Sequence, residues 1–144
     1  METCRIYLSG AMSGISFEEQ SRWRRQVRDA IIYGDFDHNK NITFFDPTQY
    51  YNFEEKQHKT EREIFEFDLY NLRNSDLVII NLNNGGDKSI GSAMELMLAK
   101  ELRIPVIAFG ANDKDVHSWL LECCTRVCDS MRDAVNHVAE FYLS

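Results

Sequence analysis

Hydrophobic residues along this chain alternate between short uninterrupted runs and longer stretches in which they recur every three or four positions. The short runs predict strands at residues 5–10, 41–47, 76–83 and 104–110. The longer patterns predict helices at residues 16–32, 60–74, from about 93 to the next strand, 115–122 and 130–142. Two of these helices begin at a hydroxyl residue followed three positions later by glutamate, which predicts N-caps at Ser16 and Thr60.

The order of these elements predicts an α/β fold with three layers, in which helices cover both faces of a parallel sheet. The run "DLVIINLN" is apolar without alternation, as expected of a strand buried on both faces. A length of 144 residues is that of one ordinary domain, and we expect a single domain over residues 1–144. Ligands of such sheets bind at the carboxyl ends of the strands, which directs attention to loops 9–14, 81–92 and 110–115.

Two carboxylates fall on helix faces that are otherwise apolar. Glu95 lies on a stripe that should pack on the sheet, together with Leu98, Ala99 and Leu102. Asp68 lies mid-helix on a similar stripe, formed by Ile64, Phe65, Leu69 and Leu72. Both helices adjoin the strand at 76–83, so we expect the two acids to meet near its carboxyl end. Burying two acids close together costs free energy unless their ionisation is useful, which favours an active site.

Each acid also has a structural interpretation. Ser92 and Glu95 have the spacing of a capping box, which would contribute about 1 kcal/mol and need no function. Asp68 could instead form a buried ion pair with an arginine, the candidates being Arg5, Arg73 and Arg103. Because Asp68 is mid-helix and cannot serve as a cap, we favour the functional interpretation.

A pair of carboxylates in a cleft indicates glycosyl transfer, in which one acts at an anomeric carbon and the other handles a proton. Glu95 lies near a helix N-terminus, where the dipole favours the anionic form that a nucleophile needs. Asp68 has apolar neighbours in mid-helix, so we expect it to have the raised pKa and to carry the proton.

Composition narrows the classes of function. Net charge is −7, so a long polyanion such as DNA would be repelled, and we expect no nucleic-acid partner. No apolar run approaches the roughly 18 residues that span a bilayer, and no secretion signal is evident, so we expect no membrane partner and a cytoplasmic location. The cysteines form no CxxC pair, and we expect reduced thiols and no metal site at Cys4, Cys123, Cys124 and Cys128.

Three segments together resemble a known family. They are "IYLSGAMSG", "FDLYNLRNSDLVIINLN" and "SIGSAMELMLAKELRIPVIAF", and they are similar to the nucleoside 2-deoxyribosyltransferases, a family that includes the related 2'-deoxynucleoside 5'-monophosphate N-hydrolases. The resemblance covers the first strand and most of residues 60–110. It implies a flavodoxin-like or Rossmann-like fold, a homodimer or higher homo-oligomer, and neither metal nor organic cofactor.

The resemblance also implies roles for three residues. Glu95 matches the nucleophile that attacks C1' of a 2'-deoxyribosyl group and displaces the nucleobase. Asp68 matches the aspartate that assists departure of the base, and Tyr7 matches the tyrosine that orients the glutamate. A nucleobase or water would then resolve the covalent intermediate, so transferase and hydrolase both remain open.

The position six residues before the glutamate is an aspartate in the transferases and a serine in the monophosphate hydrolases, where it helps to hold the 5'-phosphate. Here it is Ser89, as in the hydrolases. The first loop departs from them, because they carry serine and arginine where this chain has Ala11 and Ser13. The resemblance also implies that Ser118, or its neighbour His117, reaches the 5' end from an adjacent subunit, with an ordinary surface position on a helix as the alternative for both. The other expected substrate-binding residues are Gly10, Ala11, Met12, Asn81, Gly91 and Ser92.

The leading hypothesis is therefore an enzyme whose partners are a nucleoside or nucleotide and a nucleobase. A second hypothesis is a nucleotide-sensing module of the same fold without turnover, in which a neutral isostere of Glu95 would leave binding intact. A third is an interaction domain in which Glu95 and Asp68 serve the fold alone.

Overall fold

The computed structural model describes residues 2–12, 14–50, 59–83, 88–111 and 115–144. Within these residues, five parallel strands form one sheet in the order β2-β1-β3-β4-β5. The strands are β1 (Thr3–Gly10), β2 (Asn41–Phe45), β3 (Leu77–Asn81), β4 (Val106–Phe109) and β5 (Arg126–Val127). The helices are α1 (Phe17–Ile32), the short 3-10 helix η1 (Pro47–Tyr50), α2 (Glu61–Arg73), α3 (Ile90–Glu101), α4 (Ser118–Glu122) and α5 (Met131–Tyr142).

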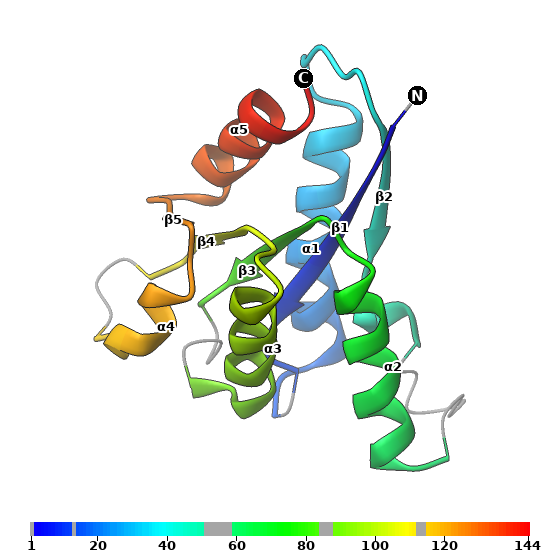
Figure 1. Cartoon of the computed structure of the whole chain (residues 1–144), viewed down its shortest axis with the longest axis vertical. Coiled ribbons are helices and arrows are strands. Elements are labelled where there is room, and N and C mark those ends of the chain that lie inside the picture. Colours follow the sequence, from blue (N-terminus) through cyan, green and yellow to red (C-terminus); the bar gives the residue numbers. More distant parts are fainter. Residues whose placement is uncertain (1, 13, 51–58, 84–87, 112–114) are drawn as a thin grey trace.

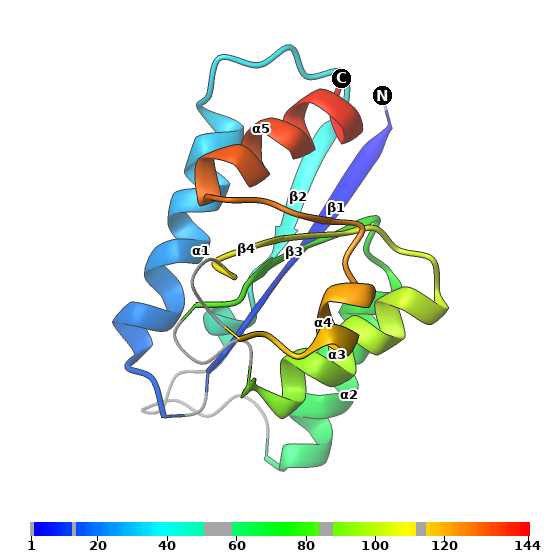
Figure 2. The ribbon, with the colours of Figure 1, turned by 90° about the vertical axis from the view of Figure 1, so that its left-hand side faces the viewer.

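Helices cover both faces of the sheet, which confirms the three-layer α/β architecture. Figures 1 and 2 show α1 and α5 on one side of the strands and α2, α3 and α4 on the other. Each face has its own apolar core: one includes Ile6, Leu8, Val27 and Val138, and the other Val78, Ile80, Leu72 and Leu96. Because both faces are covered, β3 and β4 are buried along their whole length, as the uninterrupted apolar runs predicted.

Side chains of β1 alternate between the two layers, and this alternation positions the residues of the site. Ile6 and Leu8 face α1 and α5, whereas Tyr7 belongs to the core under α2 and α3. Ser9, two residues after Tyr7, contacts α3 on that same side. The strand therefore delivers two hydroxyl side chains to one face, next to the end of β3.

Several element boundaries differ from the prediction for local reasons. β2 ends at Phe45 because Asp46 accepts hydrogen bonds from the Thr48 amide (2.9 Å) and hydroxyl (2.5 Å) and opens η1. The N-caps Ser16 and Thr60 are confirmed. Phe65 was wrongly placed on the inward face of α2, since it is 43% exposed. Residues 49–59 were expected to form a surface loop because they show no periodicity, and residues 51–58 of it lie outside the described residues, as do Ser13, 84–87 and 112–114.

Gly10 and Gly91 give a matched pair of substitutions. A Cβ on Gly10 would lie 2.8 Å from Trp23 Cζ2, whereas one on Gly91 would meet only Ser89 Oγ, at 3.9 Å. We expect Gly10→Ala to lower the free energy of unfolding by about 1–3 kcal/mol through overpacking. Gly91→Ala should be neutral or stabilising by up to about 1 kcal/mol, because a helical glycine loses more backbone entropy. Urea unfolding would measure both, and equal midpoints for the two variants would contradict the Trp23 contact.

Candidate active site

Glu95 occupies the second turn of α3. The helix has Ser89 as its N-cap, whose hydroxyl accepts a hydrogen bond from the Ser92 amide at 3.2 Å. The capping box predicted for Ser92 and Glu95 is therefore wrong, because the helix begins earlier and Ser92 is already inside it. Glu95 is partly buried, and Leu96 and Ala99 on the same helix are fully buried. A capping role does not explain the inward orientation of this carboxylate.

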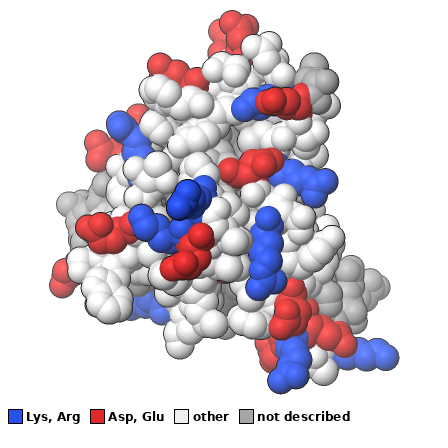
Figure 3. All heavy atoms as spheres, in the orientation of Figure 1, with Lys and Arg blue, Asp and Glu red and all other residues white. Residues whose placement is uncertain are grey.

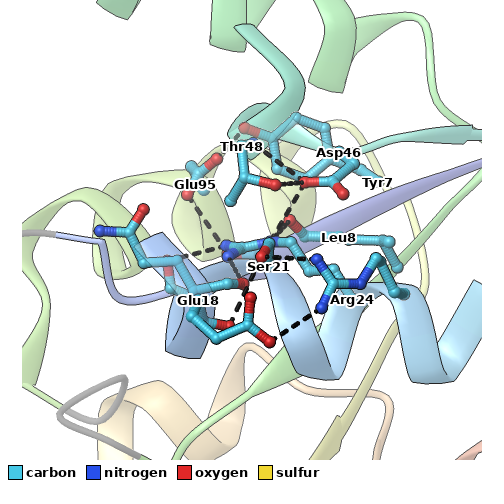
Figure 4. Close-up of polar contacts among 12 residues, drawn as sticks. Tyr7, Leu8, Glu18, Ser21, Arg24, Asp46, Thr48 and Glu95 are labelled. Carbon is cyan, nitrogen blue, oxygen red and sulfur yellow. Dashed lines mark hydrogen bonds and ion pairs between the residues drawn. The ribbon is translucent and has the colours of Figure 1, made fainter. Parts of the chain in front are cut away.

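Two hydroxyl groups of β1 hold the carboxylate of Glu95. The Tyr7 hydroxyl donates to Glu95 Oε2, and the Ser9 hydroxyl donates to Glu95 Oε1 at 3.2 Å. Tyr7 is fully buried, so its ring cannot turn away from the site without leaving the core. Figure 4 shows Tyr7 and Glu95 in the same cluster as Asp46 and Arg24. Each carboxylate oxygen thus has its own donor, at the carboxyl end of the strand.

Asp68 joins this cluster electrostatically from α2. It is half-buried, and its charge acts on Glu95 and on Arg24. The arginines that were candidates for a buried ion pair with Asp68 are all exposed: Arg5, Arg73 and Arg103. The buried cation on which the charge of Asp68 acts is Arg24 of α1, which the sequence reading did not consider.

The pKa of Glu95 is raised to about 7, and the largest cause is burial, which disfavours the charged carboxylate. The hydrogen bond from Tyr7 counteracts this rise because it stabilises the anion, as do the Ser9 hydroxyl and the charge of Arg24, whereas the Asp68 carboxylate adds to it. The expectation that the helix dipole would keep Glu95 anionic was therefore wrong, because desolvation outweighs it. A carboxyl group with this pKa exchanges its proton near neutral pH.

A wall of aromatic side chains stands beside Tyr7. The rings of Tyr7 and Phe45 stack at a centroid distance of 5.1 Å, and those of Phe45 and Tyr50 at 5.4 Å. Phe67 of α2 meets Tyr50 edge to face at 4.9 Å. Tyr50 and Phe67 are half-buried, so the wall continues from the core to the surface next to the carboxylates. Such a surface suits a flat aromatic ligand.

The first turn of α3 adds polar groups near Glu95. Gly91 is exposed and has open space around its Cα. The Ser92 hydroxyl is buried and, among the described residues, has no hydrogen-bond partner. The O–H of Ser89 stays available for donation, since its oxygen is the one that caps the helix. These three residues, all predicted to bind substrate, lie within two turns of the carboxylate.

The loop after β1 is held from below by Gln20. This buried amide donates to the carbonyls of Met12 (2.5 Å) and Ile15 (2.7 Å). Ala11 and Met12 are half-buried there, at the carboxyl edge of the sheet. Trp23 packs against the Cα of Gly10 and leaves no room for a side chain. The packing of the protein therefore explains this glycine without a contact to substrate.

The structure does not bring two other predicted residues to Glu95. Asn81 points to the opposite face of the sheet, where it lines a hollow of about 400 Å³ with Trp23 and Phe109. Its side-chain oxygen accepts from the Asn83 amide at 2.9 Å. Ser118 is exposed at the start of α4. Among the described residues, it makes no hydrogen bond to Glu95 or Asp68.

Sequence reasoning missed Ser9, Arg24 and Asp46. Arg24 carried a signal, because it shares the inward stripe of α1 with the apolar Val27 and Ile31. Ser9 carried one as well, being two residues after Tyr7 and so on the same face of the strand. Asp46 and Pro47 gave only the signal that ends the strand predicted at residues 41–47.

The sequence profile described as "Nucleoside 2-deoxyribosyltransferase like" matches residues 3–111. The matched stretch contains Tyr7, Asp68 and Glu95. The chain belongs to this family. The resemblance drawn from the sequence is thus confirmed, and no curated protein matches the chain.

Solved structures share the fold of this family member at low sequence identity. A 2-deoxyribosyltransferase from Bacillus psychrosaccharolyticus has a TM-score of 0.67 and 19% identity, covering 92% of this chain and 91% of that one. A conserved protein from Enterococcus faecalis V583 has a TM-score of 0.66 and 19% identity, covering 96% and 98%. A CMP N-glycosidase from Clostridium botulinum has a TM-score of 0.56 and 11% identity, covering 95% and 99%.

Positive and negative side chains are mixed on the surface of the protein. Figure 3 shows acidic and basic side chains interspersed over one face of the molecule. Among the described residues, no three His, Cys, Asp or Glu side chains are grouped so as to hold a metal ion. None of the described helices is both long and apolar enough to cross a bilayer.

The raised pKa of Glu95 predicts how stability depends on pH. The unfolded carboxyl ionises near 4.5 and the folded one near 7, so charging Glu95 opposes folding as pH rises through this window. We expect Glu95→Gln to raise the free energy of unfolding by about 2–3 kcal/mol at pH 8 and by little at pH 4. Denaturant unfolding at both pH values measures this, with the exposed Glu101→Gln as control. A Glu95→Gln variant no more stable than wild type at pH 8 would show that the carboxylate is not desolvated.

Proposed function

We propose that this protein cleaves or exchanges the N-glycosidic bond of 2'-deoxynucleosides or their 5'-monophosphates through a covalent glycosyl-Glu95 intermediate. The observation that carries the proposal is the arrangement of Glu95, a desolvated carboxylate with one hydroxyl donor on each oxygen at the carboxyl edge of a parallel sheet. Family membership supports it, as do the activities of two structural neighbours, the 2-deoxyribosyltransferase and the CMP N-glycosidase. Free thiols and an acidic surface fit a cytoplasmic location.

In the first step, an oxygen of ionised Glu95 forms a bond to C1' while the bond from C1' to the base nitrogen breaks. The electron pair of that bond leaves with the base, which takes up a proton. In the second step, water or another nucleobase attacks C1', loses a proton, and Glu95 departs as the carboxylate. The donors Tyr7 and Ser9 hold the attacking carboxylate in one orientation and stabilise it again when it is released.

Asp68 is the group that we assign to the proton. Its charge acts on Glu95, so the two carboxyl groups are near each other, and we place Asp68 beside the leaving base. The aromatic wall of Phe45, Tyr50 and Phe67 is next to it and offers rings against which a base can stack. Stacking would fix the plane of the base and present its ring nitrogen to Asp68.

The first turn of α3 is where we place the 5' end of the substrate. Ser89 and Ser92 offer hydroxyl donors, and exposed Gly91 lets a ligand approach the backbone. A helix N-terminus favours an anion, which supports a 5'-phosphate. Against this, Ala11 provides no cation or hydroxyl to the same end. Free nucleosides and monophosphates are therefore both included in the test below, together with ribonucleotides, because one structural neighbour acts on CMP.

We further propose that the protein works as a homo-oligomer. α3 is apolar on its outer side as well as its inner side, since Ile90, Met94 and Met97 form a stripe that is 49–78% exposed. A helix that is apolar all round is usually covered. A second copy seated there would lie next to Glu95 and would allow Ser118 of an adjacent subunit to approach the 5' end.

The proposed activity predicts release of free base that depends on Glu95. We expect wild type to release base from at least one member of a panel of deoxynucleosides, their 5'-monophosphates and CMP, detected by chromatography with and without a second base. Glu95→Gln should lower the rate by about a thousandfold or more, because the nucleophile is lost. Glu101→Gln, at the exposed end of α3, should keep the wild-type rate.

The outcomes separate the alternatives. Release without an acceptor base would make the protein a hydrolase, and release only with an acceptor would make it a transferase. A rate unchanged in Glu95→Gln would overturn the covalent mechanism. No release from any substrate, with a nucleotide still raising the melting temperature, would favour the sensing module instead.

The oligomer proposal predicts that a charge on the α3 stripe separates the subunits. We expect Met97→Lys to shift the sedimentation velocity profile toward monomer, because a charge in an apolar interface is desolvated. Tyr33→Lys is the matched control, since Tyr33 is 82% exposed at the end of α1, on the opposite layer. A wild-type protein that is monomeric at micromolar concentration would contradict the proposal.

A further inference from the structure

Arg24 is a charged side chain buried in the protein, with 1% of its surface exposed. Taking a guanidinium out of water costs several kcal/mol unless its donors and its charge are satisfied. Here Nη1 donates to the Gln20 carbonyl at 2.6 Å, Nε to the Leu8 carbonyl at 3.2 Å, and Nη2 to the Gly10 carbonyl at 3.2 Å. The indole of Trp23 covers the guanidinium at 4.7 Å from the ring centroid.

Two of these carbonyls belong to a part of β1 that has no strand beside it on one edge. β2 pairs with β1 only as far as Tyr7, opposite Phe45, whereas β3 pairs with β1 to its end at Gly10. Carbonyls of β1 alternate in direction: that of Glu2 faces β2 and that of Arg5 faces the β3 side. By this alternation the Leu8 and Gly10 carbonyls face the edge where β2 has already ended. Arg24 supplies the donors that a longer β2 would have supplied.

The residue between these two carbonyls is Ser9, which donates to Glu95. Fixing the carbonyls of Leu8 and Gly10 therefore fixes the backbone that carries this donor. Tyr7 precedes Leu8 directly, so both hydroxyls that hold the Glu95 carboxylate depend on the same stretch of β1. Figure 4 shows Arg24 in the same cluster as Leu8 and Asp46, and its Nε is the atom nearest both.

Arg24 also balances the charge of the site. Its Nε lies 3.9 Å from Asp46 Oδ1, a carboxylate that is itself 2% exposed. The groups that act on Glu95 are Tyr7 and Ser9 from β1, Asp68 from α2 and Arg24 from α1. Among these, Arg24 is the cation. It is thus the counter-charge, among the described residues, to an acidic cluster of Glu95, Asp68 and Asp46.

We propose that Arg24 is a positioning residue for the chemistry of Glu95: its guanidinium replaces the missing strand partner of β1 and so aims Ser9 and Tyr7 at the carboxylate. The inference rests on the proposed function for its kinetic consequence, but not for its structural one. A role in stability alone is the competing explanation, since Arg24 also joins α1 to the sheet. The experiment must therefore measure quantities that a loss of stability alone would not change, namely kcat against KM and the pH at which Glu95 titrates.

The experiment compares Arg24→Gln, which removes the charge, with Arg24→Lys, which keeps it but loses the fork of donors. Arg25→Gln is the matched control, because Arg25 is the next residue, is exposed, and bonds within α1 to Ser21 and Glu18. Base release gives kcat and KM over a range of pH. Independently, ¹³C NMR follows the titration of the Glu95 carboxyl, assigned by its absence in Glu95→Gln.

We expect Arg24→Gln to lower kcat by about 100-fold, with KM within about threefold of wild type. Loss of the cation should move the Glu95 titration midpoint upward by about half a pH unit or more. Arg24→Lys should restore the midpoint and part of kcat, and Arg25→Gln should change neither. A folded Arg24→Gln with an unchanged midpoint and unchanged kcat would overturn the proposal.

Should Arg24→Gln fail to fold, Arg24→Lys combined with Ser9→Ala decides. If Arg24 acts through Ser9, the double variant should lose no more kcat than whichever single variant, Arg24→Lys or Ser9→Ala, loses more. Losses that add in free energy would overturn the inference. If wild type turns over no substrate, the proposed function fails, while the NMR midpoints still test Arg24. A Glu95 titration midpoint that stays at the wild-type value in both Arg24→Gln and Arg24→Lys would then contradict the role proposed for Arg24.

Discussion

The two hydrogen bonds that Tyr7 and Ser9 donate to Glu95, together called the clamp below, are the interaction on which the rest of this structure depends. A partly buried carboxylate at the edge of the core is held by the hydroxyls of Tyr7 and Ser9, one on each oxygen. Both donors come from one strand, so their mutual position is set by the pleat of β1 and by its pairing with β3. Desolvation and Asp68 push the proton onto Glu95, whereas the two donors and Arg24 favour the anion. The group is consequently poised between its two protonation states near neutral pH.

The clamp depends on where the strands end. Because β2 stops at Phe45, the last residues of β1 project beyond one neighbour, and their carbonyls bond to a side chain instead of a strand. The same early end lets Asp46 and η1 turn across the site and bring Tyr50 to the aromatic wall. The arginine counter-charge and the aromatic wall beside Glu95 thus share one cause, the unequal lengths of two adjacent strands.

Local pattern was enough to predict the layers, the central strands and the inward orientation of Glu95, because periodicity reports which face of an element is buried. The role of Tyr7 came only from family resemblance, since a buried strand tyrosine is ordinary. Ser9 and Arg24 were missed because their importance depends on strand register and strand ends, which are set by non-local pairing. The pKa of Glu95 was predicted in the wrong direction because desolvation is a property of the assembled site. Asn81 was expected to bind substrate, yet it lies on the face of the sheet opposite Glu95, as alternation along β3 indicates.

The i, i+2 spacing of Tyr7 and Ser9 restricts how this protein can change during evolution. A one-residue shift in the register of β1 at Tyr7 and Ser9 would turn both hydroxyls to the face of α1 and α5 and bring Ile6 or Leu8 to Glu95. No gradual series of shifts connects the two registers. New specificities are therefore expected to arise by substitution around a fixed strand or by changes in loop length after Gly10, while the length of β1 before the site stays constant among descendants that keep the chemistry.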